Sequence, residues 1–216
     1  MKRVYLLSFW LLLTLMGTAT AQINPKTFDK GVIINGVKWA TRNVNTPGTF
    51  VAKSKDVGMF FQWNRRVGWS ATDPMENSDE GTTWDDSDAT GEAWKKSCDP
   101  SPVGWRIPNF DDIEKLLDDT KVKSEWTTVN GVSGRKFTDK TSGNSLFLPA
   151  AGYRSYDGGM LLKAGTDGLY WSSTAHETYE SDAYYLDFYN SGADCRHSYG
   201  RKFGFRVGFS IRCVAE

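Results

Sequence analysis

Histidine is nearly absent from this sequence: His176 and His197 are the only two among 216 residues. Neither belongs to an HExxH helix or to the close imidazole spacing that a zinc site needs. A lone histidine in a loop is more often a surface or contact residue than a general base. We therefore expect a protein that is not an enzyme and that uses no cofactor and no metal.

The chain also lacks an apolar run long enough to cross a membrane. Its longest run, residues 4–16, is shorter than the roughly 18 to 20 residues of a spanning helix. Lys2 and Arg3 precede the run and the small residues 19–21 follow it, which is typical of a secretory signal peptide. We expect residues 1–21 to be removed on export to the periplasm, the cell surface or the medium, without membrane insertion.

An excess of either charge is missing as well. The 26 basic and 26 acidic residues balance, and loss of Lys2 and Arg3 with the signal peptide leaves 24 basic side chains. A nucleic-acid partner is not expected, because it would require a basic patch. The mature 195 residues suffice for one domain with a sizeable core. We expect residues 22–30 to form a short tether and residues 31–216 to form that domain.

Cysteine is scarce, with three residues in the chain. In an exported protein, three cysteines leave one unpaired if a single disulfide forms. Cys98 and Cys213 are favoured as the pair, because Cys213 falls on the apolar parity of the last predicted strand and Cys98 precedes the turn-rich segment PVGWRIP. Closing so long a loop would stabilise the fold by about 4 kcal/mol. Cys195 would then remain a shielded thiol.

Aromatic residues and glycine are plentiful, and the apolar residues come in short alternating runs. Two such runs flank Asn35-Gly36 in GVIINGVKWATRNV, the strongest short signal for a β-hairpin. GMFFQW, residues 58–63, predicts another strand, and residues 203–213 alternate as a strand with one buried face does. The polar residues 70–97 predict a long loop excursion.

One helix is clearly marked. Asn109 can cap its start, and Asp111 and Asp112 lie in the first turn beside the positive end of the helix dipole. Apolar residues then follow at helical spacing: Phe110, Ile113, Leu116 and Leu117. The element pattern predicts an α+β fold of mostly antiparallel strands with one or two helices and long loops.

The acidic residues 85–94, DDSDATGEAW, begin like a calcium-binding loop. The matching positions are Asp86, Asp88, Thr90 and Gly91. The bidentate glutamate that closes such a loop would fall at Ser97, so the match fails. We expect a plain acidic loop here and not a calcium site.

The candidate binding residues precede the last predicted strand. Within residues 183–189, Tyr185, Asp187 and Tyr189 share the parity that would face outward from a half-buried strand. Tyrosine offers rigid contact area, small polar side chains offer adaptable hydrogen bonds, and arginine is frequent in binding hot spots. We predict a ligand-binding surface of Tyr185, Asp187, Tyr189, Asn190, Ser191, Asp194, Arg196, His197, Tyr199 and Arg201. The alternative is a solvated hairpin whose tyrosines cover the edge of the core.

Seven motifs in order along the chain carry a family resemblance. They are NGVKWATRNV (35–44), GMFFQWNRR (58–66), CDPSPVGWRIP (98–108), LFLPAAGYR (146–154), GLYWSST (168–174), AYYLDF (183–188) and GFSIRCV (208–214). The chain resembles the Fibrobacter succinogenes major paralogous domain, a bacterial secreted and surface family that is similar to C-type-lectin-like folds. The resemblance implies a C-type-lectin-like domain with paired terminal strands, one well-defined helix and a Cys98–Cys213 disulfide.

Two groups of relatives suggest different functions. Formylglycine-generating enzymes use two active-site cysteines, and here only Cys195 remains beyond the expected disulfide. Variable proteins of diversity-generating retroelements are lectin-like receptors with a WSS-like motif and an R-C-V end, which this chain has at residues 171–173 and 212–214. Residues 181–201 also lack Lys, Glu, Gln, Met and Trp, which adenine-directed mutation of AAC-type codons does not produce.

These observations predict an exported binding or adhesion module whose ligand is a protein or a glycan. The resemblance adds the hypothesis that a retroelement diversifies residues 176–206. The alternative is a structural subunit of a bacterial surface appendage or complex, whose partners are other surface proteins.

Overall fold

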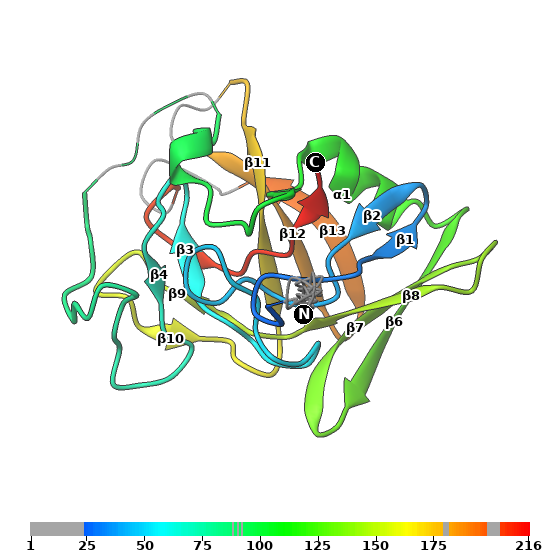
Figure 1. Cartoon of the computed structure of the whole chain (residues 1–216), viewed down its shortest axis with the longest axis horizontal. Helices are drawn as coiled ribbons and strands as arrows, with labels where there is room; N and C mark the ends of the chain where they lie inside the picture. Colours follow the sequence, from blue (N-terminus) through cyan, green and yellow to red (C-terminus); the bar gives the residue numbers. More distant parts are fainter. Residues whose placement is uncertain (1–23, 88, 90, 92, 179–181, 198–203) are drawn as a thin grey trace, which may run out of the picture.

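The computed structural model describes residues 24–87, 89, 91, 93–178, 182–197 and 204–216, and strands dominate them (Figure 1). These strands form four antiparallel sheets, ordered β1-β2-β15-β5, β10-β9-β14-β3-β4, β11-β12-β13 and β6-β7-β8. The elements are β1 Val32–Ile34, β2 Val37–Trp39, β3 Phe60–Gln62, β4 Gly68–Trp69, η1 Lys96–Cys98, β5 Trp105–Arg106, α1 Phe110–Leu117, β6 Val122–Val129, β7 Val132–Asp139, β8 Ser145–Pro149, β9 Tyr153–Arg154, β10 Leu161–Leu162, β11 Gly168–Ala175, β12 Ala183–Tyr189, β13 Gly192–His197, β14 Gly208–Phe209 and β15 Val214–Ala215.

The predicted α+β, C-type-lectin-like fold is wrong. In the described part of the chain, α1 is the single α-helix and η1 is one short 3-10 turn, so the architecture is nearly all β. The physical reason lies in the apolar spacing, which is helical only across α1. Elsewhere apolar residues come in short runs between turn residues, a pattern that antiparallel strands satisfy.

The predicted N-terminal hairpin is confirmed. β1 and β2 pair around Asn35-Gly36, whose φ angles are 45° and 79°. Both angles are positive, as the two central residues of a type I′ hairpin turn require. β2 also pairs with β15, Trp39 opposite Val214, so the N-terminal hairpin and the C-terminal strand share one sheet.

The predicted helix is also confirmed, together with its cap. The Asn109 side chain accepts a 2.9 Å hydrogen bond from the backbone N–H of Asp112, whose Oδ2 accepts one of 3.0 Å from the N–H of Asn109. This reciprocal capping box satisfies two backbone donors at the start of the helix. The buried face of α1, Ile113 and Leu116, packs against the sheet formed by β11, β12 and β13.

The C-terminal run does not form the single half-buried strand that its alternation predicts. Among the described residues from 204 onward, β14 and β15 are the two strands. Two of the polar positions are as buried as the apolar ones, since Ser210 and Arg212 are 0% and 1% exposed. The reason is that β14 lies between β9 and β3 in the middle of its sheet, so the segment runs through the interior. Arg212 is tolerated there because its Nε donates a 2.8 Å hydrogen bond to Oδ1 of Asn43.

Two buried tryptophans anchor the long polar excursion of residues 70–97. The Trp84 ring lies 4.8 Å from that of Trp69, and the Trp94 ring lies 5.6 Å from that of Trp63. Residue 93 also bridges to Thr174 of β11. The segment is therefore a loop, as predicted, and it contributes two tryptophan side chains to the core.

The expected Cys98–Cys213 disulfide is not formed. Cys98, Cys195 and Cys213 are all free thiols. Cys98 and Cys213 do belong to the same hydrophobic cluster, but Cys213 Sγ hydrogen-bonds to Oγ of Ser101 at 3.2 Å. Burial raises the pKa of Cys195 to about 12, so its thiol stays protonated at neutral pH.

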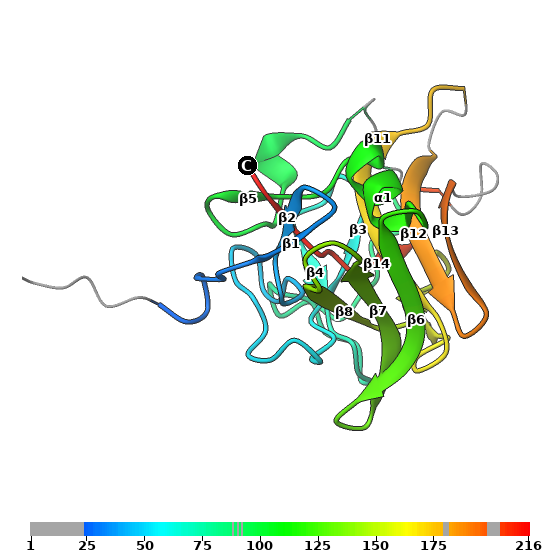
Figure 2. The same cartoon turned by 90° about the vertical axis from the view of Figure 1, so that its right-hand side faces the viewer.

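Two of the sheets create the setting of the candidate site. β6, β7 and β8 form a long curved ribbon, and the β12–β13 hairpin lies beside it (Figure 2). Phe188 of β12 fills the space between them, with its ring 6.4 Å from Phe137 of β7 and 6.5 Å from Trp126 of β6. Among the described residues, no helix has the length and apolar composition needed to cross a membrane.

Candidate functional site

The predicted binding segment is a β-hairpin. β12 and β13 pair in register from Tyr184 opposite His197 to Tyr189 opposite Gly192, with Asn190-Ser191 as the turn. Tyr199 and Arg201 lie outside the described residues. For His197 the structure places the backbone, at the end of β13.

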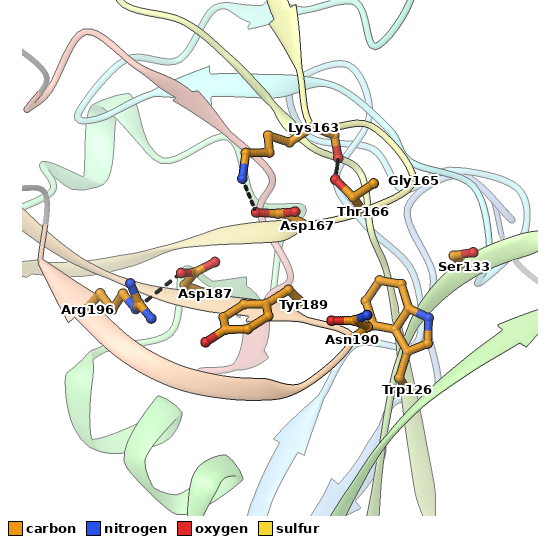
Figure 3. A pocket seen from close by; sticks show the side chains of 10 residues that line it. All are labelled: Trp126, Ser133, Lys163, Gly165, Thr166, Asp167, Asp187, Tyr189, Asn190 and Arg196. Carbon is orange, nitrogen blue, oxygen red and sulfur yellow. Dashed lines mark hydrogen bonds and ion pairs between the residues drawn. The ribbon is translucent and has the colours of Figure 1, made fainter.

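Four of the predicted residues meet at one groove with a volume of about 570 Å³. The remaining walls come from the β6–β7 hairpin and from the loop that precedes β11 (Figure 3). The residues that line the groove are Trp126, Ser133, Lys163, Gly165, Thr166, Asp167, Asp187, Tyr189, Asn190 and Arg196. Three segments that are distant in sequence therefore build one surface.

The charges of the groove are paired within it. Lys163 Nζ lies 2.9 Å from Asp167 Oδ2, and Arg196 Nε lies 3.2 Å from Asp187 Oδ2. Figure 3 shows the two carboxylates between the two cations, with Tyr189, Asn190 and Trp126 farther along the groove. The lining thus carries no net charge, while each ionic group keeps hydrogen-bonding capacity beyond its own pair.

Asp187 is the buried member of this set, with 9% of its surface exposed. Burial raises the pKa of the Asp187 carboxyl, and the Arg196 guanidinium opposes that effect without reversing it. For Lys163 the partner outweighs burial, because the hydrogen bond to Asp167 raises the pKa of the ammonium group. The Lys163 ammonium group therefore stays charged at neutral pH.

A close approach at Gly168 fixes the loop against β12. Gly168 stands opposite Phe188 in the β11–β12 register, and a Cβ at Gly168 would lie 2.1 Å from Cζ of Phe188. Glycine is needed because the Phe188 ring crosses over the strand at this point. Asp167, the preceding residue, is thereby held at the edge of the groove.

The sequence did not predict six of the lining residues: Trp126, Ser133, Lys163, Gly165, Thr166 and Asp167. For Trp126 the sequence offered one signal, the Asn130-Gly131 turn that places the preceding residues in a hairpin strand. The i,i+4 spacing of Lys163 and Asp167 indicates an ion pair. Nothing in the sequence indicated that these two segments meet the β12–β13 hairpin.

Tyr185 is not part of the groove. Its ring packs on the core, 4.9 Å from the ring of Phe209 and 6.2 Å from that of Trp171, and burial raises its pKa to about 12. This residue fits the alternative reading, in which a tyrosine covers the edge of the core. Ser191 and Asp194 are exposed and do not line the groove, although Asp194 Oδ2 lies 3.9 Å from Arg196 Nε.

The groove is suited to reversible contacts with a polar ligand. It combines two aromatic rings, from Trp126 and Tyr189, with carboxylate, amide, hydroxyl and guanidinium groups. Within the described residues, no group of three or more His, Cys, Asp or Glu side chains could hold a metal ion. Asp88 and Thr90 of the acidic loop lie outside those residues.

One comparison with known proteins matches a segment of the chain. No curated protein and no solved structure matches the sequence. Residues 115–213 match a family described as a domain of unknown function, DUF8237. All ten residues that line the groove fall within the matched segment, so over these residues the chain is similar to that family across the whole candidate site.

Proposed function

We propose that this chain is an exported, non-enzymatic binding or adhesion module whose ligand occupies the groove. One observation carries the proposal: Asp187, Tyr189, Asn190 and Arg196, predicted as contact residues from strand parity and residue type, line the same groove as the partly exposed Trp126. A hairpin that served only to cover the core would not require these polar groups to converge beside an accessible tryptophan.

The chemistry of the groove favours a glycan over a protein as the ligand. Sugar hydroxyls donate and accept hydrogen bonds at once, and the groove offers both acceptor carboxylates and donor cations in neutralised pairs. The C–H face of a sugar ring packs on an aromatic ring, a role open to Trp126 and Tyr189. A groove without net lining charge suits a neutral saccharide.

The test is binding of the mature protein to an array of neutral and acidic glycans, compared with the Trp126→Ala and Tyr189→Ala variants. We expect each variant to lose at least about tenfold in affinity, because each removes an aromatic contact at the centre of a small site. Thermal unfolding measured in parallel separates lost binding from lost folding.

Tyr184→Ala is the matched control. Tyr184 is a partly buried tyrosine of the same strand, but its ring contacts Phe110 at 4.5 Å and it does not line the groove. Binding that survives in Tyr184→Ala and is lost in Tyr189→Ala supports the proposal. Equal loss of binding in the two variants would count against it.

The alternative function, a structural subunit of a surface complex, has one observation in its favour. β13 stands at the end of the order β11-β12-β13, and an edge strand is a template for pairing with another chain. Size measurement in solution separates the two: a monomer favours the binding module, and self-assembly favours the subunit.

Diversification by a retroelement stays a hypothesis that rests on composition and on the family resemblance. The lectin-like fold with which it was associated is not the observed fold. Deep sequencing of the gene in a growing population tests it directly. Substitutions concentrated in codons 176–206 beside a near-identical template would support it, and an invariant segment without a template would exclude it.

A further inference from the structure

A second pocket, with a volume of about 520 Å³, shares no lining residue with the groove. It lies where the start of β13, Gly192 and Ala193, approaches β6 and β7. Its charged lining consists of three cations, Lys123, Arg135 and Lys140, and one carboxylate, Asp119. We refer to it as the cationic pocket.

Arg135 is the unusual member of the cationic pocket. Only 8% of its surface is exposed, yet no carboxylate pairs with it in the part of the chain that the structure describes. Its Nε donates to Oγ of Ser124 and its Nη1 donates a 2.9 Å hydrogen bond to the main-chain oxygen of Tyr189, and both acceptors are neutral.

Two other shielded arginines of this chain, Arg42 and Arg154, each pair with a carboxylate. Arg42 Nε lies 3.0 Å from Asp29 Oδ2, and Arg154 Nη1 lies 2.7 Å from Asp73 Oδ1. A buried charge is costly unless it is paired. Burial accordingly lowers the pKa of the Arg135 guanidinium. Arg212 is also held by neutral acceptors, but it is 1% exposed within the core. Arg135 differs from it because it lines a pocket, where its charge is open to a ligand.

The rim of the cationic pocket adds to this positive field. Lys123 and Lys140 are exposed, and the charge of Lys123 is partly offset by Glu125, whose Oε2 lies 2.7 Å from its Nζ. Lys140 Nζ donates a 2.5 Å hydrogen bond to the main-chain oxygen of Asp119. That bond leaves the charge of the ammonium group uncompensated. The Asp119 carboxylate is exposed to solvent and opposes the cations from the rim.

We propose that the cationic pocket binds a small oxyanion, the carboxylate, sulfate or phosphate group of a ligand. Nε and one hydrogen of Nη1 are engaged by Ser124 and Tyr189, so the outer edge of the Arg135 guanidinium, which includes Nη2, remains to meet two oxygens of the anion. Lys123 and Lys140 contribute attraction at the rim without a fixed geometry.

The experiment is an NMR titration of the full mature chain with acetate, sulfate or inorganic phosphate, each at constant ionic strength maintained with sodium chloride. The reporters are the backbone amides of Gly192 and Ala193 and the Nε–H of Arg135. We expect saturable shifts with at least one anion. The preferred anion then assigns the group as a carboxylate or as a sulfate or phosphate. Shifts that follow ionic strength alone would overturn the proposal.

Two lysine variants provide a matched pair. Lys123 and Lys136 each lie 2.7 Å from a carboxylate oxygen of Glu125, but only Lys123 lines the cationic pocket. Lys123→Gln should lower the affinity for the anion about two- to fivefold, and Lys136→Gln should leave that affinity unchanged. Arg135→Met should abolish the saturable shifts caused by the anion. If Arg135→Met fails to fold, the lysine pair still decides, because equal effects of the two lysine variants would contradict the site.

Discussion

Asp187 Oδ2 lies 3.2 Å from Arg196 Nε, and the two residues stand diagonally on β12 and β13, since Asp187 is opposite Asp194 and Tyr185 is opposite Arg196. The carboxylate is buried while the guanidinium is 44% exposed. Solvent around the guanidinium therefore weakens the ion pair. The attraction to Arg196 does not fully offset the free-energy cost of burying the Asp187 carboxylate. The groove holds a charge that costs stability, as functional sites often do.

The first prediction concerns Asp187→Asn. Because burial raises the pKa of Asp187 in the folded state above its ordinary value of 3.8, the unfolded chain loses that proton first as pH rises. Ionised Asp187 thus destabilises the fold at neutral pH, and asparagine should increase the free energy of unfolding there. The gain should shrink as pH falls through the raised pKa and vanish below 3.8.

Denaturant unfolding of wild type and Asp187→Asn at several pH values measures this difference. The same variant should bind the groove ligand more weakly, because the amide cannot replace a charged acceptor. Asp194→Asn, an exposed carboxylate near the same arginine, is the control and should change stability little. A loss of stability in Asp187→Asn at neutral pH would contradict the argument.

The second prediction separates the two tyrosines of β12 that were expected to act alike. Tyr185→Ala should lower the free energy of unfolding by about 2 kcal/mol, because it leaves a void beside Phe209 and Trp171. Tyr189→Ala should change it by less than about 1 kcal/mol, since the side chain faces the groove. Chemical denaturation checks both values, and a larger loss in Tyr189→Ala would reverse the assignment.

Local signals in the sequence were reliable where one short segment decides the structure. The Asn35-Gly36 turn and the Asn109 cap act within a few residues, and both are present as predicted. The limits of β12 also match, because alternation over residues 183–189 is set by the strand itself. Such features depend on backbone geometry and neighbouring hydrogen bonds, which the sequence contains directly.

Predictions that depended on long-range packing failed or were incomplete. Residues 203–213 alternate in sequence, but residues 207–213 run through the interior, so buried Ser210 and Arg212 occupy positions expected to face solvent. Trp126 joins the groove only because β12 packs beside the β6–β7 ribbon. Which sheets pack together is a property of tertiary structure, and no single segment encodes it.

The third prediction concerns Asp139, which fastens the β7–β8 turn to the N-terminal hairpin. Its Oδ1 accepts hydrogen bonds of 2.8 and 2.9 Å from the N–H groups of Ser142 and Thr141, and its Oδ2 accepts one of 2.8 Å from Asn35. These bonds, that from Ser142 first, lower the pKa of Asp139 to about 2. A lowered carboxyl pKa contributes stability above the unfolded pKa.

Asp139→Asn should therefore destabilise the protein at neutral pH. The contribution of the wild-type carboxylate should be complete above 3.8 and should be lost as pH falls from 3.8 toward 2. The two proteins should accordingly converge in stability at the acid end of the range. Unfolding curves across that window measure the effect, and a difference that does not depend on pH would indicate a packing defect instead.

The last prediction concerns the buried pair of Arg212 and Asn43. Burial lowers the pKa of Arg212 to about 10, so the guanidinium stays charged at neutral pH, and Oδ1 of Asn43 accepts its Nε–H at 2.8 Å. Asn43 also donates from Nδ2 to the main-chain oxygen of Val57 at 2.7 Å and to Oη of Tyr170 at 3.2 Å. Asn43→Ala should cost about 3 kcal/mol, because it leaves the buried Arg212 cation and the partly buried carbonyl of Val57 with fewer partners.

A double-mutant cycle with Arg212→Met isolates the pair. Arg212→Met alone removes the charge that Asn43 satisfies, so Asn43→Ala should cost less in that background, with a coupling energy of about 1 to 3 kcal/mol. The remaining cost of Asn43→Ala then reports its bonds to Val57 and Tyr170. Strictly additive losses would mean that Arg212 is held by the main-chain oxygens of Ala40 and Phe147, and that its bond to Asn43 contributes little to the fold.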